Sequence, residues 1–280
     1  MTGASAECLQ AIESTRIKAA TIVAHAFAQV EGKSEKEICE EIVHEQSTDS
    51  ELLPLGWYDP PPAGVSVLIG KDRMGYDSIR KPEYWPRTDV RYTKDVPAMI
   101  YLSPVDRTTQ MIGDFGLTIY QGSDSVLQQH FKRGLAAILE IAEHSQVGVS
   151  FADLHATGLA VISSHGFVQA RMSLISQSLG GDENLGHTVP WSDGEPAPGE
   201  LPIEQLREKI RVARYFINSS EQYRIPETCA FTVESRLIDP KKPDLPNIFF
   251  HVIVTFSRGE KKILSNFTDI FKSSKMAYML

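Results

Sequence analysis

Apolar residues near the start of the chain recur with helical spacing in two consecutive stretches. Within residues 12–30 they fall mainly on one face, which predicts an amphipathic helix that ends at Gly32. Ser34 then opens a second helix, because Glu37 follows three residues later and the pair forms a capping box. The buried stripe of this second helix consists of Ile38, Ile42 and Val43.

The same order of signals returns in the second half of the chain. Residues 126–143 have a helical pattern, Gly148 breaks it, and Ser150 with Asp153 caps a further helix that runs to about residue 164. The repeat predicts one domain over residues 1–280, with two related halves at about 1–122 and 123–280.

Short runs of β-branched and aromatic residues lie between the helical stretches and are bounded by turn residues. The predicted strands are residues 65–69, 98–102, 115–120, 230–233 and 249–256. A loop rich in Pro, Gly and Glu starts at residue 194 and leads into a further helix at 203–218. Helices followed by strands, twice over, indicate an α+β fold and not a doubly wound sheet.

Composition and charge narrow the possible functions. The 280 residues carry a formal net charge of -8, and phosphate binding needs clustered Lys and Arg, so no nucleic-acid partner is expected. No window approaches the roughly 20 apolar residues of a membrane span. The first ten residues also lack the apolar core of a signal peptide. The three cysteines form no Cys-x-x-Cys pair, so we expect a reducing, cytoplasmic location. The chain also has no glycine-rich phosphate loop after a strand and no Gly-x-Ser-x-Gly elbow.

Three short segments carry a resemblance to a known family. Asp114 follows Gly113 and lies eleven residues after Ser103, His187 begins the segment His-Thr-Val-Pro, and Glu234 ends the segment Phe-Thr-Val-Glu. In order and spacing these segments resemble the creatinase/aminopeptidase P family, whose members include methionine and proline aminopeptidases and prolidase. The resemblance covers nearly the whole chain. It implies the family's pita-bread fold, with two pseudo-symmetric halves whose helices pack on a curved antiparallel sheet.

The resemblance also implies that most of the family's metal ligands are missing. The family usually holds two divalent metals between two aspartates, one histidine and two glutamates. At these five positions the chain has Ser103, Asp114, Gly180, Glu234 and either Phe249 or Phe250. Two carboxylates remain, whereas three protein ligands are the usual minimum for one catalytic ion. We therefore expect no metal and no cofactor.

A further departure lies upstream, in the turn Pro-Glu-Tyr-Trp-Pro. Glu83 stands there where the family often has a histidine, which in creatinase, an enzyme that works without metal, is the proton shuttle. In the family the histidine at His187 contacts substrate. The resemblance places Asp114 and Glu234 opposite each other across the sheet. A longer segment than the family usually has, a helical insert at about 194–220, is expected to roof the pocket.

Converging carboxylates without a metal would repel one another, so one of them must titrate high or a cation must neutralise them. We therefore predict a metal-independent hydrolase-like enzyme that acts on a small cationic, C–N-bonded substrate by carboxylate and histidine acid–base chemistry. The predicted catalytic residues are Asp114, Glu234, His187 and Glu83. The predicted substrate-binding residues are Ser103, Tyr84, Trp85, Trp191 and His251.

Two alternatives remain open at this point. The chain could be a non-catalytic pseudo-peptidase that binds a peptide or protein partner, since ligand loss would look the same. It could also be a residual metallopeptidase with one ion at Asp114 and Glu234. The aromatic candidates and His251 could equally be packed residues of the core. The family commonly dimerises, so a homodimer is expected.

Overall fold

The computed structural model describes residues 3–75, 78–170, 184–189 and 201–280. One curved sheet runs through the molecule, with the strand order β1-β2-β3-β7-β6-β4, and β5 and β8 also pair with β7. All of the described strand pairs are antiparallel. The strands are β1 Val65–Ile69, β2 Ala98–Leu102, β3 Phe115–Ile119, β4 Val168–Gln169, β5 Cys229–Val233, β6 Arg236–Ile238, β7 Ile248–Ser257 and β8 Glu260–Leu264.

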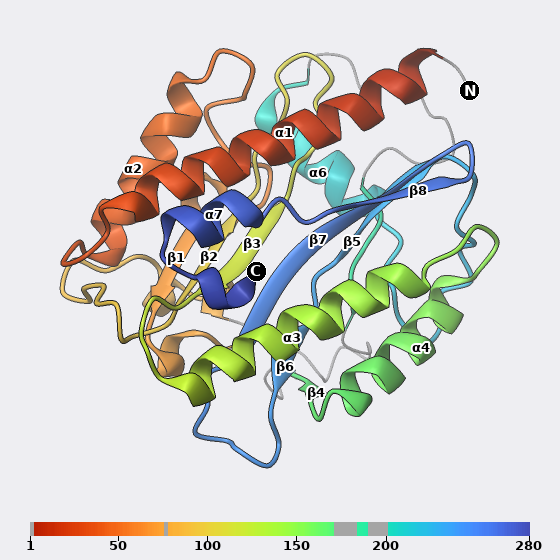
Figure 1. Cartoon of the computed structure of the whole chain (residues 1–280). Coiled ribbons are helices and arrows are strands. Elements are labelled where there is room, and N and C mark those ends of the chain that lie inside the picture. The colour runs from red at the N-terminus through yellow and green to blue at the C-terminus, as the bar shows by residue number, and fades with distance from the viewer. Residues whose placement is uncertain (1–2, 76–77, 171–183, 190–200) are drawn as a thin grey trace.

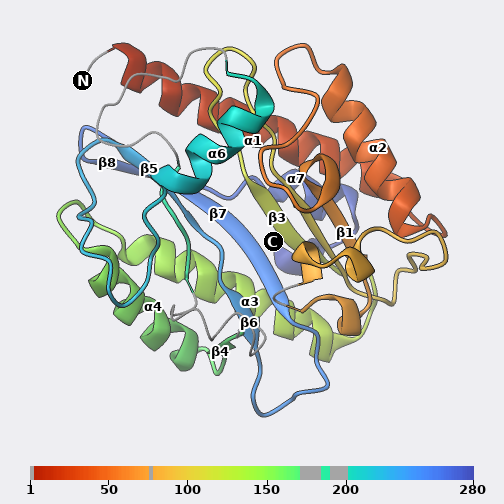
Figure 2. The same ribbon diagram turned by 180° about the vertical axis from the view of Figure 1, so that it is seen from behind.

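Helices cover one face of this sheet, and a shorter helix lies on the other. In Figure 1, α1, α3 and α7 pass in front of the strands, and α4 lies beside α3. Figure 2 shows the opposite side, where α6 lies in front of the sheet. The helices are α1 Gly3–Ala28, α2 Glu35–Thr48, α3 Ser125–His144, α4 Phe151–Ser164, α6 Ile203–Ala213 and α7 Thr268–Ser273. Short 3-10 helices occur at Pro62–Gly64, Lys71–Arg73, Ser78–Arg80, Pro82–Tyr84 and Ala277–Met279.

The two helix junctions predicted from the repeat have closely similar local structure. The Ser34 hydroxyl accepts a hydrogen bond from the Glu37 N–H at 3.2 Å, and the Ser150 hydroxyl accepts one from the Asp153 N–H at 3.1 Å. The glycines Gly32 and Gly148 both have a positive φ, of 80° and 86°. Each junction also receives an arginine from its own half. The Arg91 and Arg224 guanidinium groups donate to the Gly32 and Gly148 carbonyl oxygens at 2.7 and 2.8 Å.

A fully buried arginine ties the first helix to the middle of the sheet. The Arg16 guanidinium donates to the backbone carbonyls of Asp114, at the start of β3, and of His251, within β7. It also donates to the carbonyl of Ser265 at 3.0 Å, and it lies over the Phe115 ring at 4.7 Å. α1 thereby fixes the relative position of two strands that supply side chains to the cavity described below.

The α+β fold class predicted from the sequence is confirmed, and most predicted elements appear at the expected residues. Strands β1 and β2 have the predicted bounds. The helix predicted at 203–218 ends at Ala213, because Arg214 takes an extended backbone conformation. None of the helices that the structure describes is long and apolar enough to cross a membrane. Gly180 and Trp191 lie outside the described residues.

Candidate functional site

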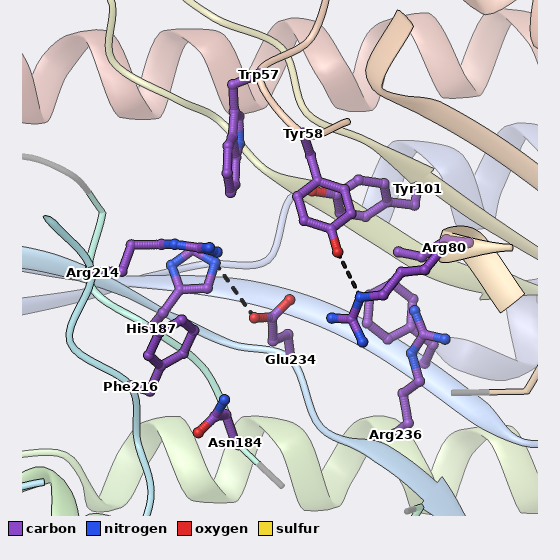
Figure 3. A pocket seen from close by; sticks show the side chains of 12 residues that line it. Trp57, Tyr58, Arg80, Tyr101, Asn184, His187, Arg214, Phe216, Glu234 and Arg236 are labelled. Carbon is purple, nitrogen blue, oxygen red and sulfur yellow. Dashed lines mark hydrogen bonds and ion pairs between the residues drawn. The ribbon is translucent and has the colours of Figure 1, made fainter. Parts of the chain in front are cut away.

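A cavity lies beside the centre of the sheet and receives side chains from both halves of the chain (Figure 3). The first half contributes a loop before β1 and the middle of β2. The second half contributes the segments around β5 and β7 and the residues that follow α6. The lining residues on which the chemistry depends are Trp57, Tyr58, His187, Arg214, Glu234 and Arg236.

Glu234 lies at the centre of this cavity, directly after β5. Its Oε1 lies 3.5 Å from the Nε2 of His187, and its Oε2 lies 3.4 Å from the Nε2 of His251. About a quarter of the side chain is exposed, which gives a bound molecule access to the carboxylate. Burial raises the pKa of Glu234, and the positive charges of Arg214 and Arg236 oppose that effect. Glu234 is therefore the carboxylate that two imidazoles flank.

Asp114 lies directly before β3 and is almost fully buried. Its Oδ1 accepts a hydrogen bond from the indole N–H of Trp57. Its Oδ2 lies 3.9 Å from the Nε2 of His187 and has no hydrogen-bond partner among the described residues. Burial raises the pKa of Asp114 to about 8, although the hydrogen bond from Trp57 opposes the shift. At neutral pH the side chain is therefore mainly a protonated carboxylic acid.

The tautomer of His187 follows from its backbone contact. Its Nδ1 lies 2.9 Å from the Thr188 carbonyl oxygen, and a carbonyl only accepts, so Nδ1 carries the proton. Burial lowers the pKa of His187 to about 3, so the ring is neutral and Nε2 presents a lone pair. That lone pair faces the oxygens of Glu234 and Asp114. Three acceptor atoms converge here, and a stable arrangement needs a proton, or an N–H of a bound molecule, between them.

His251 completes the group from the middle of β7. Both ring nitrogens are buried without a hydrogen-bond partner among the described residues. Burial lowers the pKa of His251 well below its ordinary value, and the charge of Arg16 acts in the same direction. The imidazole is therefore neutral beside Glu234. The structure brings together four of the predicted site residues, Asp114, His187, Glu234 and His251.

Arginine side chains border the cavity on two sides, and the sequence analysis did not find them. The Arg214 guanidinium lies between the rings of Trp57 and Phe216, 5.0 Å from each ring centroid. Its Nε is buried without a hydrogen-bond partner among the described residues, and burial lowers its pKa. On the other side, Arg80 donates to the Tyr58 hydroxyl at 2.7 Å. Positive charge near Glu234 thus comes from the chain itself, and neutralisation does not require a cationic guest.

Glu83, Tyr84 and Trp85 do not reach the cavity, which corrects the sequence prediction. Glu83 is exposed in the 3-10 helix Pro82–Tyr84. The reason is a buried carboxylate at the start of α2. Glu35 binds the Arg73 guanidinium at 2.8 Å, and Arg73 in turn donates to the Tyr84 carbonyl at 3.1 Å. This contact holds the turn at a distance from Glu234.

Ser103 has a structural role, which is a second correction. Its hydroxyl is fully buried, donates to the Gly64 carbonyl at 3.1 Å and accepts from the Tyr58 N–H at 3.1 Å. Its carbonyl also accepts from the Trp57 N–H at 3.0 Å. Both hydrogen-bonding functions of the hydroxyl are engaged with backbone, so Ser103 cannot contact a substrate. It instead fixes the loop that brings Trp57 and Tyr58 to the cavity.

The residues present do not fit the metal pair that the family resemblance implies. Within the described ranges, no group of three or more His, Cys, Asp or Glu side chains is placed to hold a metal ion. Ser103 is bound to backbone, one Asp114 oxygen is bound to an indole N–H, and Phe249 lies against Arg236 at 4.6 Å. An indole N–H only donates, so it cannot share the Asp114 oxygen with a metal.

The curved antiparallel sheet with its helix pairs is the pita-bread fold. No protein-family model and no curated protein sequence matches the chain. Solved structures with this fold do match it. An X-Pro aminopeptidase from Thermotoga maritima is 14% identical with a TM-score of 0.62, over 93% of this chain and 61% of that one.

Two further solved structures match with similar identity, TM-score and coverage. The prolidase from Pyrococcus furiosus is 16% identical with a TM-score of 0.62, over 92% of this chain and 64% of that one. The proline aminopeptidase P II from Yersinia pestis is 14% identical with a TM-score of 0.63, over 97% of this chain and 60% of that one. The chain spans about three fifths of the length of these peptidases. At such low identity the likeness establishes the fold, and the chemistry has to be argued from the residues of the cavity.

Proposed function

We propose that this chain is a metal-independent hydrolase that cleaves a C–N bond in a small substrate. The observation that carries the proposal is the convergence of Glu234, His187 and Asp114. These three groups lie close enough together to share one exchangeable proton. Perturbed acids and bases of this kind, in a cavity, are typical of acid–base catalysis. The peptidases that share the fold are hydrolases, which supports the same class of reaction.

The residues divide the reaction between a base and an acid. Glu234, flanked by two neutral imidazoles, takes a proton from a water molecule whose oxygen attacks the substrate carbon. As the C–N bond breaks, the protonated Asp114 supplies a proton to the leaving nitrogen through the Nε2 position of His187. The leaving group departs as a neutral molecule, and the proton taken from water remains on Glu234. Two carboxyl groups in different states of ionisation suit this division of roles.

The two ends of the cavity also indicate the form of the substrate. An amine, amidine or guanidinium group can donate N–H hydrogen bonds to Glu234 and to the Nε2 of His187, and this end is the cationic one expected from the sequence. The Arg214 guanidinium, held between two aromatic rings, offers a place for a carboxylate. We therefore propose a small zwitterionic substrate, with its nitrogen at Glu234 and its carboxylate at Arg214.

The test is an assay of dipeptides, amidino acids and guanidino acids in the presence of a chelator. For any substrate that is turned over, Glu234→Gln or His187→Asn should lower kcat/KM by about 10²–10⁴-fold. Arg214→Met should act mainly on KM, because it removes a binding charge.

Glu83→Gln is the matched control, since this exposed carboxylate lies outside the cavity and its loss should leave kcat/KM unchanged. An equal loss in Glu83→Gln and Glu234→Gln, or activity that the chelator abolishes, would contradict the proposal. Binding of these compounds without turnover would favour the pseudo-peptidase alternative.

A further inference from the structure

The walls of the cavity carry a charge opposite to that of the whole molecule. The chain has 28 Lys and Arg against 36 Asp and Glu, a formal net charge of -8. Of the described residues that line the cavity, the charged ones are three arginines, Arg80, Arg214 and Arg236, and one glutamate, Glu234. The buried carboxyl group and the imidazoles described above add little charge at neutral pH. A concave site lined mainly by positive charge attracts anionic ligands.

The arginines lie on opposite sides of Glu234 (Figure 3). Arg214, between its two aromatic rings, is on one side, and Arg80 and Arg236 are on the other. Burial raises the pKa of Glu234, and the charges of all three arginines oppose that rise, so all of them act on this carboxylate. Glu234 therefore stands between two separate centres of positive charge, and its single negative charge can balance only one of them.

Contacts with the cavity wall position the two guanidinium groups opposite Arg214. The Arg236 side chain is buried, donates to the Gly75 carbonyl at 2.8 Å and lies over the Phe249 ring at 4.6 Å. The Arg80 side chain is exposed and donates to the Tyr58 hydroxyl at 2.7 Å. Both arginines have further interactions, so what they offer a ligand is a positioned charge. The planar fork of a guanidinium suits a carboxylate better than an ammonium group does.

We infer, on the basis of the proposed function, that the substrate carries a second carboxylate on the other side of its nitrogen. The nitrogen then lies at Glu234, the first carboxylate at Arg214 and the second at Arg236 and Arg80. A compound with one ammonium and one carboxylate has no net charge and gains little from a positive cavity. A compound with two carboxylates has a net negative charge and gains more. The substrate class is therefore a small diacid with a nitrogen between its acidic groups.

The experiment measures equilibrium binding of two matched pairs of compounds to the full chain. Iminodiacetate has an ammonium between two carboxylates, and N-(2-hydroxyethyl)glycine has a hydroxymethyl group in place of one carboxylate. The pair of 3,3′-iminodipropionate and N-(3-hydroxypropyl)-β-alanine is longer. Isothermal titration calorimetry is performed at neutral pH with a chelator. At least one diacid should bind about tenfold or more tightly than its matched monoacid, the gain expected of a hydrogen bond between charged groups.

Variants locate the second carboxylate. Arg236→Met should lower the preference for the diacid by about tenfold, and Arg80→Met should lower it by less, because solvent screens an exposed charge. Neither variant should alter the affinity for the monoacid, whereas Arg214→Met should weaken both members of a pair alike. Arg211→Met is the matched control. Arg211 lies on α6, is 59% exposed and pairs with Glu208, so its loss should leave the preference unchanged.

Near-ultraviolet circular dichroism checks that each variant is folded, and Arg80→Met at the exposed position is decisive if Arg236→Met does not fold. Equal binding, or no measurable binding, of both members of each pair to wild type would overturn the inference. Folded Arg236→Met and Arg80→Met that keep the full preference would also overturn it.

The two proposals can fail separately, because none of the four compounds has a nitrogen bound to a carbonyl carbon and binding is read without hydrolysis. Hydrolysis of neutral dipeptides without a preference for diacids would leave the proposed reaction intact and remove the second carboxylate. A preference for diacids without hydrolysis of any compound would support the binding site and contradict the reaction.

Discussion

At the scale of single residues, the environment of one carboxyl group sets the chemistry of the cavity. Asp114 is surrounded by protein, and the hydrogen bond from the Trp57 indole N–H and the charges of Arg214 and Arg16 favour its charged form. The pKa of Asp114 rises from 3.8 to about 8, chiefly because burial disfavours the carboxylate. The side chain is therefore an acid at neutral pH, and its loss of a proton should have a measurable effect on folding.

The first prediction concerns the free energy of unfolding as a function of pH. Between about pH 4 and 8 the folded chain holds a proton on Asp114 that the unfolded chain has released, so stability should fall as pH rises through this window. The slope should reach at most about 1.4 kcal/mol per pH unit and should level off above pH 8. Asp114→Asn should lack this contribution. Urea unfolding at pH 5, 6.5 and 8 measures this. The free energy of unfolding of Asp114→Asn should rise relative to that of wild type as pH increases, and a constant difference between the two would contradict the prediction.

The spacing of motifs located several site residues but not their neighbours. Asp114, His187 and Glu234 belong to short segments that resemble those of a known family, and that resemblance implied their convergence. Arg214 and Trp57 lie in segments without such a pattern, and a cation between two rings arises only when distant parts of the chain meet. Ser103 was predicted to bind substrate, but its hydroxyl is bound to backbone of the loop before β1, and no sequence pattern marks those hydrogen-bond partners.

At the scale of elements, the loop before β1 is tightly packed against Ser103. Gly64 has a φ of 73°, and an added Cβ would lie 2.5 Å from the Ser103 hydroxyl oxygen and 2.6 Å from the Cα of Gly56. Two separate physical effects act against a side chain here, backbone strain and a steric clash. Gly32 has a similar φ of 80°, with no atom within 4 Å of an added Cβ, so it isolates the first effect.

The second prediction follows from this pair of glycines. Gly32→Ala should cost about 1 kcal/mol in the free energy of unfolding, from backbone strain alone. Gly64→Ala should cost about 2–4 kcal/mol, because overpacking adds about 1–3 kcal/mol. Chemical denaturation of both variants measures the difference. Equal costs would mean that the contact with Ser103 can relax, and the loop would then not be fixed as described.

The predicted elements agree with the structure where the sequence signal was long. β1, β2 and β3 are mainly apolar runs that are buried throughout, and α3 has a clear helical stripe of apolar residues. β4 has two residues and β6 has three, which is too few for any periodicity to show. These short strands depend on their neighbours in the sheet, because β6 pairs with β7 and β4 pairs in turn with β6.

At the scale of the whole molecule, Arg16 connects a helix to two strands and to the segment after β8. Its guanidinium donates to three backbone carbonyls and has no carboxylate among the described hydrogen-bond partners.

Arg16→Met should therefore lower the free energy of unfolding by roughly 3 kcal/mol or more, because it leaves buried carbonyl oxygens without donors. Lys18→Ala, two residues away, breaks partly exposed ion pairs with Asp49 and Glu51 and should cost at most about 1 kcal/mol. Thermal unfolding of both variants, at one pH, makes the comparison, and a similar loss from each would count against the role of Arg16.

The ten-residue strand β7 joins the two halves of the chain. This one strand pairs with β3 from the first half and with β5, β6 and β8 from the second. Neither half of the chain contains a complete sheet. Separating the two halves would therefore break strand hydrogen bonds and expose apolar residues. We therefore expect the residues on both sides of β7 to fold as a single cooperative unit, and partial opening on either side would expose the strand that both share.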